Sequence, residues 1–382
     1  MKVLITTDLY TTATNGVVTS VRNLAEELRS RGHEVKILTV SDTKESRREG
    51  DVTYIGSVSL EKIYPNVRKP ITYHHPLIKE IINWKPDVIH TQSEFFTFRL
   101  AKQISKKTDA PIIHTYHTLY EQYAGYVIRS KWLGLQVTRI LSKLLLLKAV
   151  RIIVPSHKIE ATLLGYGMKN PISVVPSGIS LEQHRRRITA EERTEKRHSL
   201  GIVNSDCVMV YLGRLGMEKS LDELLRYFAD ALRERASLKF LIVGDGPARA
   251  ELESLTASLG ITDHVIFTGM VKPSEVQNYY QLGDVFVSAS TSETQGLTYI
   301  EAAANGLPLL CREDLCLCDV ILPGENGYTY TNEDEFLKAL DKIRLTPDWR
   351  AAAGIRSEEI AMGFDKKTFG EKIEKIYESV RN

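Results

Sequence analysis

The first half of the chain alternates short apolar runs with longer segments in which apolar positions recur every three or four residues. Short runs rich in Val and Ile are typical of buried strands, and the longer segments are typical of amphipathic helices. The helix predicted over residues 16–31 ends at Gly32, which readily adopts the left-handed conformation of a helix stop. The predicted strands are residues 3–6, 35–39, 88–91, 112–115, 152–154 and 173–175. This order predicts a parallel sheet with helices on both faces.

The same alternation begins again after a polar, charge-dense stretch that follows Ser177. We expect this stretch to be an exposed linker with a short helix, its charges solvated. The second set of predicted strands is residues 208–212, 240–243, 265–267, 285–287 and 309–311, with helices at about 220–235, 247–259, 273–282 and 296–305. The pattern predicts an α/β fold of two Rossmann-like domains, residues 1–178 and 200–363, joined by the linker 179–199. Open α/β sheets bind ligands at the carboxyl ends of their strands, so we expect the site in a cleft between the domains.

Residues 292–301 read S-E-T-Q-G-L-T-Y-I-E, which combines two carboxylates with a turn that opens an apolar helical pattern. Such a turn directs free backbone N–H groups and the positive end of a helix toward whatever lies in front of it, and a phosphate fits there. Glu293 and Glu301 flank the turn and can accept hydrogen bonds from sugar hydroxyls. A phosphate with sugars on either side describes a nucleotide-sugar.

Two cations, Arg214 and Lys219, follow a predicted strand in the same domain. Breaking a glycosyl–phosphate bond places negative charge on the departing diphosphate, and fixed cations stabilise that charge more in the transition state than in the ground state. Arg can grip two phosphate oxygens, while Lys acts as a point charge. Taken alone, the two residues could be an ordinary surface pair near a helix start. The glutamate pair in the same domain favours the functional interpretation.

With Gly213, Arg214 and Lys219, the ten-residue stretch resembles the family-4 retaining glycosyltransferases, whose mark is a glutamate pair with seven residues between. The sequence of this stretch most resembles that of the diacylglycerol glucosyltransferases of bacterial membranes. The resemblance covers nearly the whole chain and is stronger in the second half. It implies the GT-B fold, with two Rossmann-like domains facing across a cleft and a last helix, residues 364–382, crossing back to the first domain. Ser220 stands where the family usually has Gly, and we expect it to cap the following helix.

The resemblance also implies roles for single residues of the second half. Glu293 would bind hydroxyls of the donor sugar, and Glu301 would bind the ribose. Val271 would line the base pocket, although a strand end in the core is an equally good interpretation. Backbone N–H groups would face the diphosphate at Gln295, Gly296 and Leu297.

Two residues of the first half complete the predicted site. Gly16 opens a helix after the first strand, where the backbone can approach a ligand and the helix N-terminus favours phosphate. A plain strand–helix turn is the alternative for Gly16. His117 follows a strand, and the resemblance places it at the donor sugar near the reacting carbon. We expect His114 to be buried in or beside that strand.

Metal-dependent glycosyltransferases use an Asp-x-Asp sequence, and this chain has none at a matching place. We therefore expect chemistry without a metal ion or cofactor, in which Arg214, Lys219 and the helix start replace the cation. The resemblance implies retention of the anomeric configuration, by a front-face displacement in which the leaving phosphate takes the acceptor proton. Three of the four cysteines cluster as C-x4-C-x-C without zinc-type partners nearby, so free thiols are expected.

The net charge of +2 hides an asymmetry: residues 1–180 carry 25 Lys and Arg against 15 Asp and Glu, and the remainder carries 25 against 33. This asymmetry indicates an anionic surface as a partner of the first half, with unequal solvated faces as the alternative. Residues 128–148 hold five cations, no acid and a tryptophan, a composition that suits the headgroup boundary of a bilayer. We expect 128–139 to lie at the membrane, residues 62–75 to add to it, and 140–148 to pack in the core.

The sequence shows neither an apolar run of about 18 residues nor the apolar core of a signal peptide, so we predict a cytoplasmic protein peripherally associated with the inner face of the cell membrane. No groove motif for nucleic acid is visible. The leading hypothesis is an enzyme that moves glucose from UDP-glucose to the 3-hydroxyl of 1,2-diacylglycerol and forms an α-monoglycosyl-diacylglycerol. The alternatives are the same transfer to a soluble or polyprenyl-linked glycan acceptor, or a nucleotide-sugar sensor without catalysis.

Overall fold

The computed structural model describes residues 1–10, 16–60, 67–117, 131–184, 186–235 and 237–381, except for the side chains of residues 131–135, 137, 141 and 183. The chain divides into two compact units. The N-terminal unit comprises Met1–Gly178 and Lys366–Asn382, and the C-terminal unit comprises Ile179–Asp365. Both units are parallel-sheet α/β folds, which confirms the predicted fold class.

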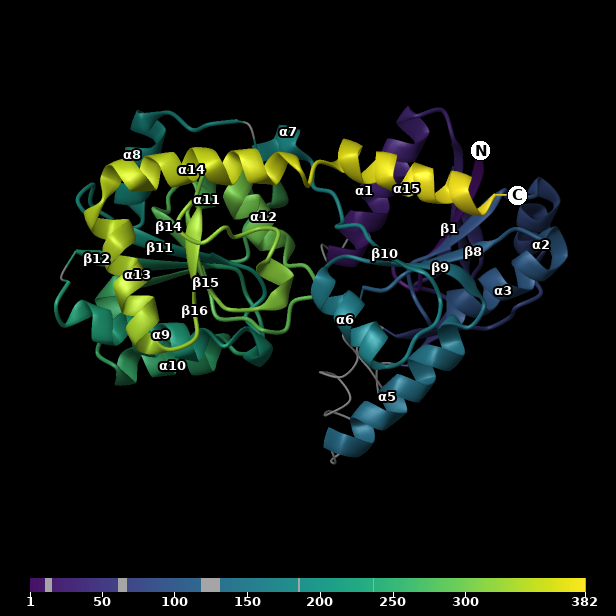
Figure 1. The fold of residues 1–382 in the computed structure, drawn as a ribbon, viewed down its shortest axis with the longest axis horizontal. Coiled ribbons are helices and arrows are strands. Elements are labelled where there is room, and N and C mark those ends of the chain that lie inside the picture. The colour runs from purple at the N-terminus through teal and green to yellow at the C-terminus, as the bar shows by residue number, and fades with distance from the viewer. Residues whose placement is uncertain (11–15, 61–66, 118–130, 185, 236, 382) are drawn as a thin grey trace. The chain divides into compact units, whose positions relative to one another are not determined.

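The N-terminal unit is built on an eight-stranded sheet with the order β10-β9-β8-β7-β1-β2-β4-β3 (Figure 1). All neighbouring strands run parallel except β3 and β4, and β5 and β6 form a small antiparallel pair. The strands are β1 Lys2–Thr6, β2 Glu34–Val40, β3 Arg47–Glu49, β4 Val52–Ile55, β5 Ser57–Ser59, β6 Arg68–Pro70, β7 Val88–Thr91, β8 Ile112–Thr115, β9 Ala149–Val154 and β10 Ile172–Val174. The helices are α1 Gly16–Ser30, α2 Pro76–Trp84, α3 Phe96–Thr108, α5 Lys131–Leu146, α6 His157–Gly165 and α15 Lys366–Val380.

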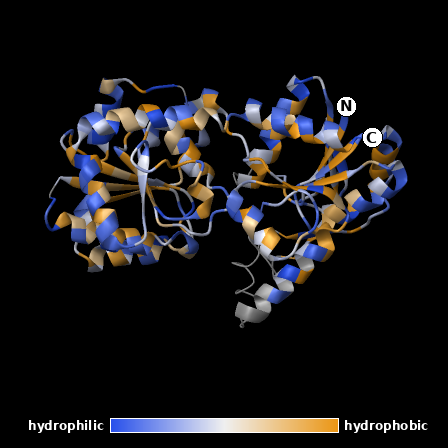
Figure 2. Cartoon of the chain, in the orientation of Figure 1, coloured by the Kyte–Doolittle hydropathy of each residue, from blue (hydrophilic) through white to orange (hydrophobic). Residues whose placement is uncertain are grey.

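Neighbouring residues of strand β1 belong to different cores, so the sheet of the N-terminal unit is covered on both faces. Val3 and Ile5 pack in a cluster with α1 and α15, while Leu4 packs in a cluster with α2 and α3. Because both faces are buried, the strands have continuous apolar runs in the sequence. The strands are accordingly the apolar interior in Figure 2, and the helices carry polar outer faces.

The last helix, α15, belongs to the N-terminal unit and packs beside α1, although it follows the whole C-terminal unit in sequence (Figure 1). Phe369, Ile373 and Tyr377 are buried in the core with the strands. At the outer edge, Arg31 at the end of α1 pairs with Glu371 and Glu374 of α15. The prediction that the last helix crosses back to the first domain is confirmed.

The C-terminal unit has a six-stranded, fully parallel sheet with the order β13-β12-β11-β14-β15-β16. The strands are β11 Cys207–Leu212, β12 Leu238–Val243, β13 Val265–Gly269, β14 Val285–Ser288, β15 Leu309–Arg312 and β16 Gly327–Tyr330. The α-helices are α7 Leu181–His184, α8 Ala190–Ser199, α9 Leu221–Leu232, α10 Arg249–Ser258, α11 Val276–Tyr280, α12 Leu297–Ala304, α13 Glu333–Leu345 and α14 Pro347–Met362. The single-turn 3-10 helices are η1 Met217–Lys219, η2 Thr262–His264, η3 Pro273–Glu275 and η4 Leu315–Leu317.

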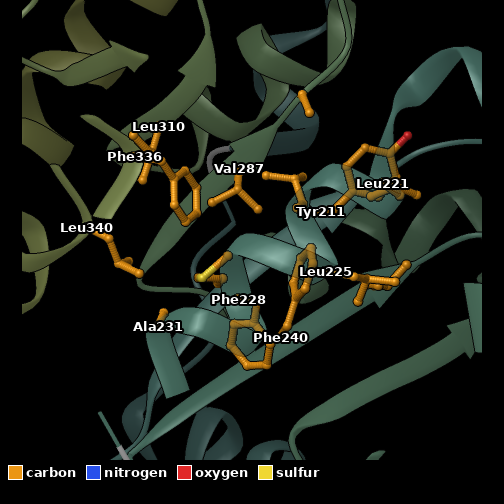
Figure 3. Packing of buried hydrophobic residues seen from close by; sticks show 14 of the residues in the cluster. Tyr211, Leu221, Leu225, Phe228, Ala231, Phe240, Val287, Leu310, Phe336 and Leu340 are labelled. Carbon is orange, nitrogen blue, oxygen red and sulfur yellow. The ribbon is translucent and has the colours of Figure 1, made fainter. Parts of the chain in front are cut away.

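One face of this second sheet is covered by α9, α10 and α13, whose side chains interdigitate with those of the strands. Figure 3 shows Leu225 and Phe228 of α9 packed against Phe240 of β12, with Phe336 of α13 beside Val287. The other face is covered by side chains of α11 and α12 and by the end of α14. Helices on both faces leave the carboxyl edge of the sheet free for the loops that carry chemistry.

Residues 179–199, expected to be an exposed linker, pack as part of the C-terminal unit. Ile179 and Leu181 lie in its core, and the guanidinium of Arg197 is buried. Arg197 donates to the Leu282 carbonyl and to Asp284 Oδ2 at 2.9 Å. The expectation that every charge of this stretch is solvated is therefore wrong for Arg197, because its partners lie more than 80 residues away in sequence.

Helix α5 also differs from the expectation. The residues Ile140, Leu144 and Leu147 are 55%, 59% and 64% exposed, whereas Leu146 is buried. The expectation that residues 140–148 pack in the core is therefore wrong for these three residues. Ile140 and Leu144 lie one turn apart on α5, and Leu147 directly follows the end of the helix. Residues 128–130 of the expected membrane segment lie outside the described residues.

Candidate functional site

The C-terminal unit has a topological switch point between β11 and β14, where the connections leave in opposite directions. The chain runs from β11 to β12 and β13 on one side, and then returns to β14 on the other side of β11. Loops that follow the two central strands therefore diverge and leave room for a ligand. Arg214 and Lys219 follow β11, and Glu293 to Leu297 follow β14, so the fold brings these predicted site residues to one place.

The turn after β14 ends at Gly296, which has a φ of 74° and is directly followed by α12. A Cβ at this position would overlap the ring of Tyr299, so only glycine fits both the backbone and the space. The first N–H groups of α12 have no carbonyl partner within the helix and carry the positive end of its dipole. Gln295, two residues before the helix, is buried, and Leu297 is half-buried.

The cations of the site are held by carboxylates. Lys219 Nζ donates to Glu293 Oε1 at 2.5 Å, so the predicted phosphate-binding lysine touches the predicted sugar-binding glutamate. The Ser290 hydroxyl also donates to Glu293 Oε1, at 3.2 Å. Arg214 pairs with Glu218 on the same loop and remains half-exposed. A diphosphate carries more negative charge than one carboxylate, so it can take over these cations and release Glu293 to accept hydrogen bonds from hydroxyls.

The loop that carries Arg214 is held by the glycine-rich turn after β12. The N–H of Leu215 donates to the Asp245 carbonyl at 2.9 Å. A Cβ on Gly244 would overlap the carbonyl oxygen of Gly213, and a Cβ on Gly246 would overlap that of Leu215. The glycines of this turn are thus required by backbone packing, and they fix the position from which Arg214 projects.

Ser220 occupies a left-handed conformation, with φ at 50°. This backbone conformation explains why the family-4 glycosyltransferases usually have Gly at this position, because glycine adopts a positive φ without steric cost. The Ser220 side chain makes no capping hydrogen bond to α9. The expectation that Ser220 caps this helix is therefore wrong.

Glu301 lies on α12 and turns inward. Its Oε2 accepts a hydrogen bond from the Tyr280 hydroxyl at 2.9 Å. Burial raises the pKa of Glu301 to about 7, against the opposing effect of the Tyr280 hydrogen bond. Glu301 is therefore a partly protonated, tyrosine-bound carboxyl group near neutral pH. Its proposed contact with ribose stays a prediction.

Val271 follows β13 by two residues and is partly buried against the core cluster of α11 and α12. It lies at the carboxyl edge of the sheet, as the other predicted residues of this unit do. Its proposed contact with the nucleotide base stays a prediction, and core packing is part of its role. A hollow of about 620 Å³ between α9, η2 and Glu333 includes none of the predicted site residues.

The N-terminal unit has its own switch point, between β1 and β7. Gly16 begins α1 after β1 and is exposed, and residues 11–15 before it lie outside the described residues. Asp8, also after β1, accepts hydrogen bonds from the backbone N–H groups of Phe96 and Thr97 at the start of α3. Burial raises the pKa of Asp8 to about 6.

His117 lies one strand further along the same edge, after β8. Its Nε2 is 2.7 Å from Gln92 Oε1, on the loop after β7. Burial lowers the pKa of His117 to about 4, so the imidazole is neutral at physiological pH. His114 is fully buried and contacts Thr91 and Glu94, as expected for a residue within the strand.

Gln92, Glu94 and Asp8 are polar residues at this edge that the sequence analysis missed. The signal that could have found them is the polar run T-Q-S-E directly after an apolar strand, because the carboxyl ends of parallel strands meet at one edge. No motif marks these residues singly. Among the residues that the structure describes, no group of three or more metal-binding side chains comes together, and no helix is long and apolar enough to cross a bilayer.

The residues expected at the membrane differ in their contacts and in their exposure. Arg139 donates through Nε to the Tyr166 carbonyl at 3.0 Å, and Arg68 donates to Ser41 and Ser57, so both arginines have structural partners. Lys69 is exposed and Ile71 is 53% exposed in the described part of the 62–75 segment. In these segments, therefore, exposed apolar side chains support membrane contact better than these two arginines, which already have hydrogen-bond partners.

Two Rossmann-like units, with cations and an open helix start at one switch point, define the GT-B class of glycosyltransferases. Residues 14–183 match the family described as Glycosyltransferase Family 4, and residues 192–359 match the family described as Glycosyl transferases group 1. The chain belongs to the family-4 glycosyltransferases and is a hexosyltransferase enzyme.

Curated relatives and solved structures agree with this family. The chain is 34% identical to an alpha-monoglucosyldiacylglycerol synthase of Streptococcus pneumoniae, over 99% of this chain and 85% of the relative. It is 31% identical to the enzyme of the same name from Acholeplasma laidlawii, over 99% and 96%. The crystal structure of Anabaena HepE in complex with UDP matches all of both chains with a TM-score of 0.77 at 17% identity, which shows the shared fold.

Proposed function

We propose that this enzyme transfers glucose from UDP-glucose to the 3-hydroxyl of 1,2-diacylglycerol at a membrane surface and forms an α-monoglucosyl-diacylglycerol. The observation that carries the proposal is the contact between Lys219 and Glu293 across the β11/β14 switch point, beside the start of α12. Whole-length similarity to two alpha-monoglucosyldiacylglycerol synthases supports the choice of donor sugar and acceptor.

In the proposed reaction, the diphosphate lies at the start of α12, with Arg214 and Lys219 on its oxygens. The bond between the glucose anomeric carbon and the β-phosphate oxygen breaks, and the acceptor oxygen forms a new bond to that carbon on the same face. The acceptor proton passes to the departing phosphate, so the charge balances. Because the new bond forms on the face that the phosphate leaves, the anomeric configuration is retained. The two cations and the N–H groups of residues 295–297 stabilise the charge that develops on the diphosphate, and no metal ion is required.

The carboxylates and the histidine bind the sugars in this proposal. Glu293, released from Lys219 by the diphosphate, accepts hydrogen bonds from glucose hydroxyls. Glu301 accepts from the ribose, and Val271 contacts the base. In the N-terminal unit, His117 contacts the glucose near its anomeric carbon and Gly16 lets the backbone approach a phosphate.

Peripheral attachment to an anionic bilayer, on the inner face of the cell membrane, is the second part of the proposal. Ile140 and Leu144 on α5, with Leu147 directly after the helix, supply exposed apolar area, and Lys148 follows Leu147 (Figure 1). Apolar side chains that enter the headgroup boundary, with cations beside them, are the usual means of interfacial binding. Lys69 and Ile71, in another part of the same unit, are exposed as well.

The experiment that tests the proposed function is incubation of the enzyme with a panel of nucleotide-sugars and with liposomes that contain diacylglycerol, followed by product mass and anomer assignment. We expect an α-linked hexosyl-diacylglycerol with UDP-glucose as the preferred donor. Transfer only to soluble or polyprenyl-linked glycans would overturn the acceptor. Tight donor binding without any transfer would indicate a sensor.

A further inference from the structure

Gln92 and His117 form a pair of polar side chains at the carboxyl edge of the N-terminal sheet. Gln92 follows β7 directly, and His117 follows β8, its parallel neighbour. The backbone N–H of Gln92 donates to the Thr6 carbonyl at 2.8 Å, which ties the residue to the end of β1 as well. Gln92 is only 3% exposed, so its side chain has little freedom to leave the histidine.

His117 differs from the two other histidines at this end of the sheet. His90 contacts Tyr377 through Nδ1 and Thr115 through Nε2, and His114 contacts Thr91 and Glu94 in the same two-sided way. His117 contacts Gln92 through Nε2, and no residue in the described part of the chain hydrogen-bonds its Nδ1. His90 and His114 are therefore fixed parts of the core, whereas one ring nitrogen of His117 has no partner among the residues that the structure describes.

The orientation of the Gln92 amide determines which ring nitrogen of His117 carries the proton. With the amide oxygen facing the ring, the neutral imidazole must carry its proton on Nε2 and donate it to Gln92. The second nitrogen, Nδ1, then has a free lone pair. The amide nitrogen of Gln92 is buried and has no hydrogen-bond partner within the described residues.

We infer that Gln92 is a positioning residue, which holds His117 in the Nε2–H tautomer so that Nδ1 accepts a hydrogen bond from a donor-sugar hydroxyl. The inference rests on the proposed function for the identity of the sugar, and on the geometry of the pair for the tautomer. A hydroxyl proton is the natural partner of a neutral imidazole lone pair, and the other tautomer would turn a donor toward it instead. Gln92 thereby acts on the sugar through His117.

The tautomer is measured directly by nitrogen NMR of the full-length enzyme labelled with 15N-histidine. The chain has ten histidines, and the His117→Ala spectrum identifies the His117 signals by their loss. We expect His117 of the unmodified enzyme to carry its proton on Nε2 and to lose this preference in Gln92→Leu. A proton on Nδ1 in the unmodified enzyme would mean that the amide of Gln92 faces the other way, and would overturn the inference.

A double-mutant cycle distinguishes positioning from mere structural support. Gln92→Leu should lower kcat/KM about 10- to 100-fold, the range typical of residues that orient a first contact. In the His117→Ala background the same change should have almost no further effect, because its target is gone. An equal loss in both backgrounds would show that Gln92 supports the fold only. Gln92→Glu keeps an acceptor oxygen in place and should restore the Nε2–H tautomer.

The control is Gln103→Leu, because Gln103 on α3 also contacts a histidine, His74, but on the outside of the same unit. It should change neither the His117 tautomer nor kcat/KM, and melting curves of both leucine variants show whether each still folds. The tautomer requires no substrate. An enzyme that fails to glucosylate diacylglycerol would therefore contradict the proposed function. The tautomer of His117 would still be tested independently by the NMR measurement.

Discussion

The two units share a parallel α/β topology with a switch point, yet their carboxyl edges carry opposite kinds of chemistry. The C-terminal unit presents Arg214, Lys219 and the open start of α12, which suit a departing diphosphate. The N-terminal unit presents neutral, hydrogen-bonded groups such as His117 and Gln92, which suit hydroxyls. In the proposed reaction, one fold would thus serve charge stabilisation in one unit and neutral recognition in the other, through the loops that follow the strands.

The largest effect should follow from removing a cation of the C-terminal unit. Lys219→Ala should lower kcat about 10²- to 10³-fold, because charge on the departing diphosphate loses a fixed partner. Lys338→Ala is the control, since Lys338 is an exposed lysine on α13 of the same unit. Steady-state kinetics with UDP-glucose measure both variants. Near-normal turnover of a folded Lys219→Ala enzyme would remove the cation from the mechanism.

The next largest effect should come from the exposed apolar residues of the N-terminal unit. Changing Ile140, Leu144 and Leu147 together to Gln should weaken sedimentation with anionic vesicles by about tenfold or more, since each buried apolar side chain is worth about 1.5–3 kcal/mol. The matched control changes three equally exposed residues of the C-terminal unit, Leu345, Ile355 and Met362, to Gln. Equal losses in the two triple variants, or no loss in the first, would contradict attachment through α5.

The helix start of the C-terminal unit depends on glycine. Gly296→Ala should cost about 1–2 kcal/mol for the left-handed backbone, and more because the methyl group meets the Tyr299 ring. Gly324→Ala has a similar φ of 84° but open space around the added methyl group, so it should show the backbone cost alone. Denaturant unfolding and UDP binding are the measurements. Equal costs in the two variants would mean that the turn before α12 yields easily.

In the N-terminal unit, the anchor of α15 is a buried neutral pair. Tyr377→Phe removes the hydroxyl that lies 2.7 Å from His90 Nδ1 and should destabilise this unit by about 1–3 kcal/mol, because a buried nitrogen loses its partner. Amide exchange of α15 and β7 reports the change. Ser379→Ala deletes an exposed hydroxyl from the same helix and should have little effect. Unchanged protection in Tyr377→Phe would show that the pair adds no stability.

The smallest effect concerns Glu301 and pH. Burial raises the pKa of Glu301 from 4.5 to about 7, so between these pH values the folded protein binds more protons than the unfolded chain. The folded state therefore loses stability as the pH rises through this window. Glu301→Gln does not titrate and should gain, relative to the unmodified enzyme, on the order of 1 kcal/mol between pH 6 and pH 8. Glu251→Gln, on the exposed face of α10, is the control. A pH-independent difference for Glu301→Gln would contradict the shift.

Much of the fold was predictable because buried parallel strands have continuous apolar sequences. Each of the eleven predicted runs overlaps a strand. The strands that were missed are short or polar, such as β3 with the sequence Arg-Arg-Glu and β16 with its two half-exposed residues. The pattern also gave no prediction for α13 and α14. Their packing follows from contacts with other elements, which a local pattern does not contain.

The candidate site was predictable where one local stretch carries the chemistry. Glu293, Gly296 and Glu301 lie within a single turn and helix, so their grouping was visible in sequence. Gln92 was not, because its pairing with His117 depends on β7 and β8 being neighbours across 25 residues. The buried Arg197 is the same case at a longer range, since its ion pair with Asp284 is made only in the folded unit.

The most direct test of the account is a crystal structure of the enzyme with UDP. The account predicts the β-phosphate at the start of α12, within hydrogen-bonding distance of Lys219 Nζ and of a backbone N–H at residues 295–297, with the Arg214 guanidinium on the same phosphates. Glu293 should have left Lys219. A diphosphate bound away from the β11/β14 switch point, or bound there while both cations keep their carboxylate partners, would contradict it.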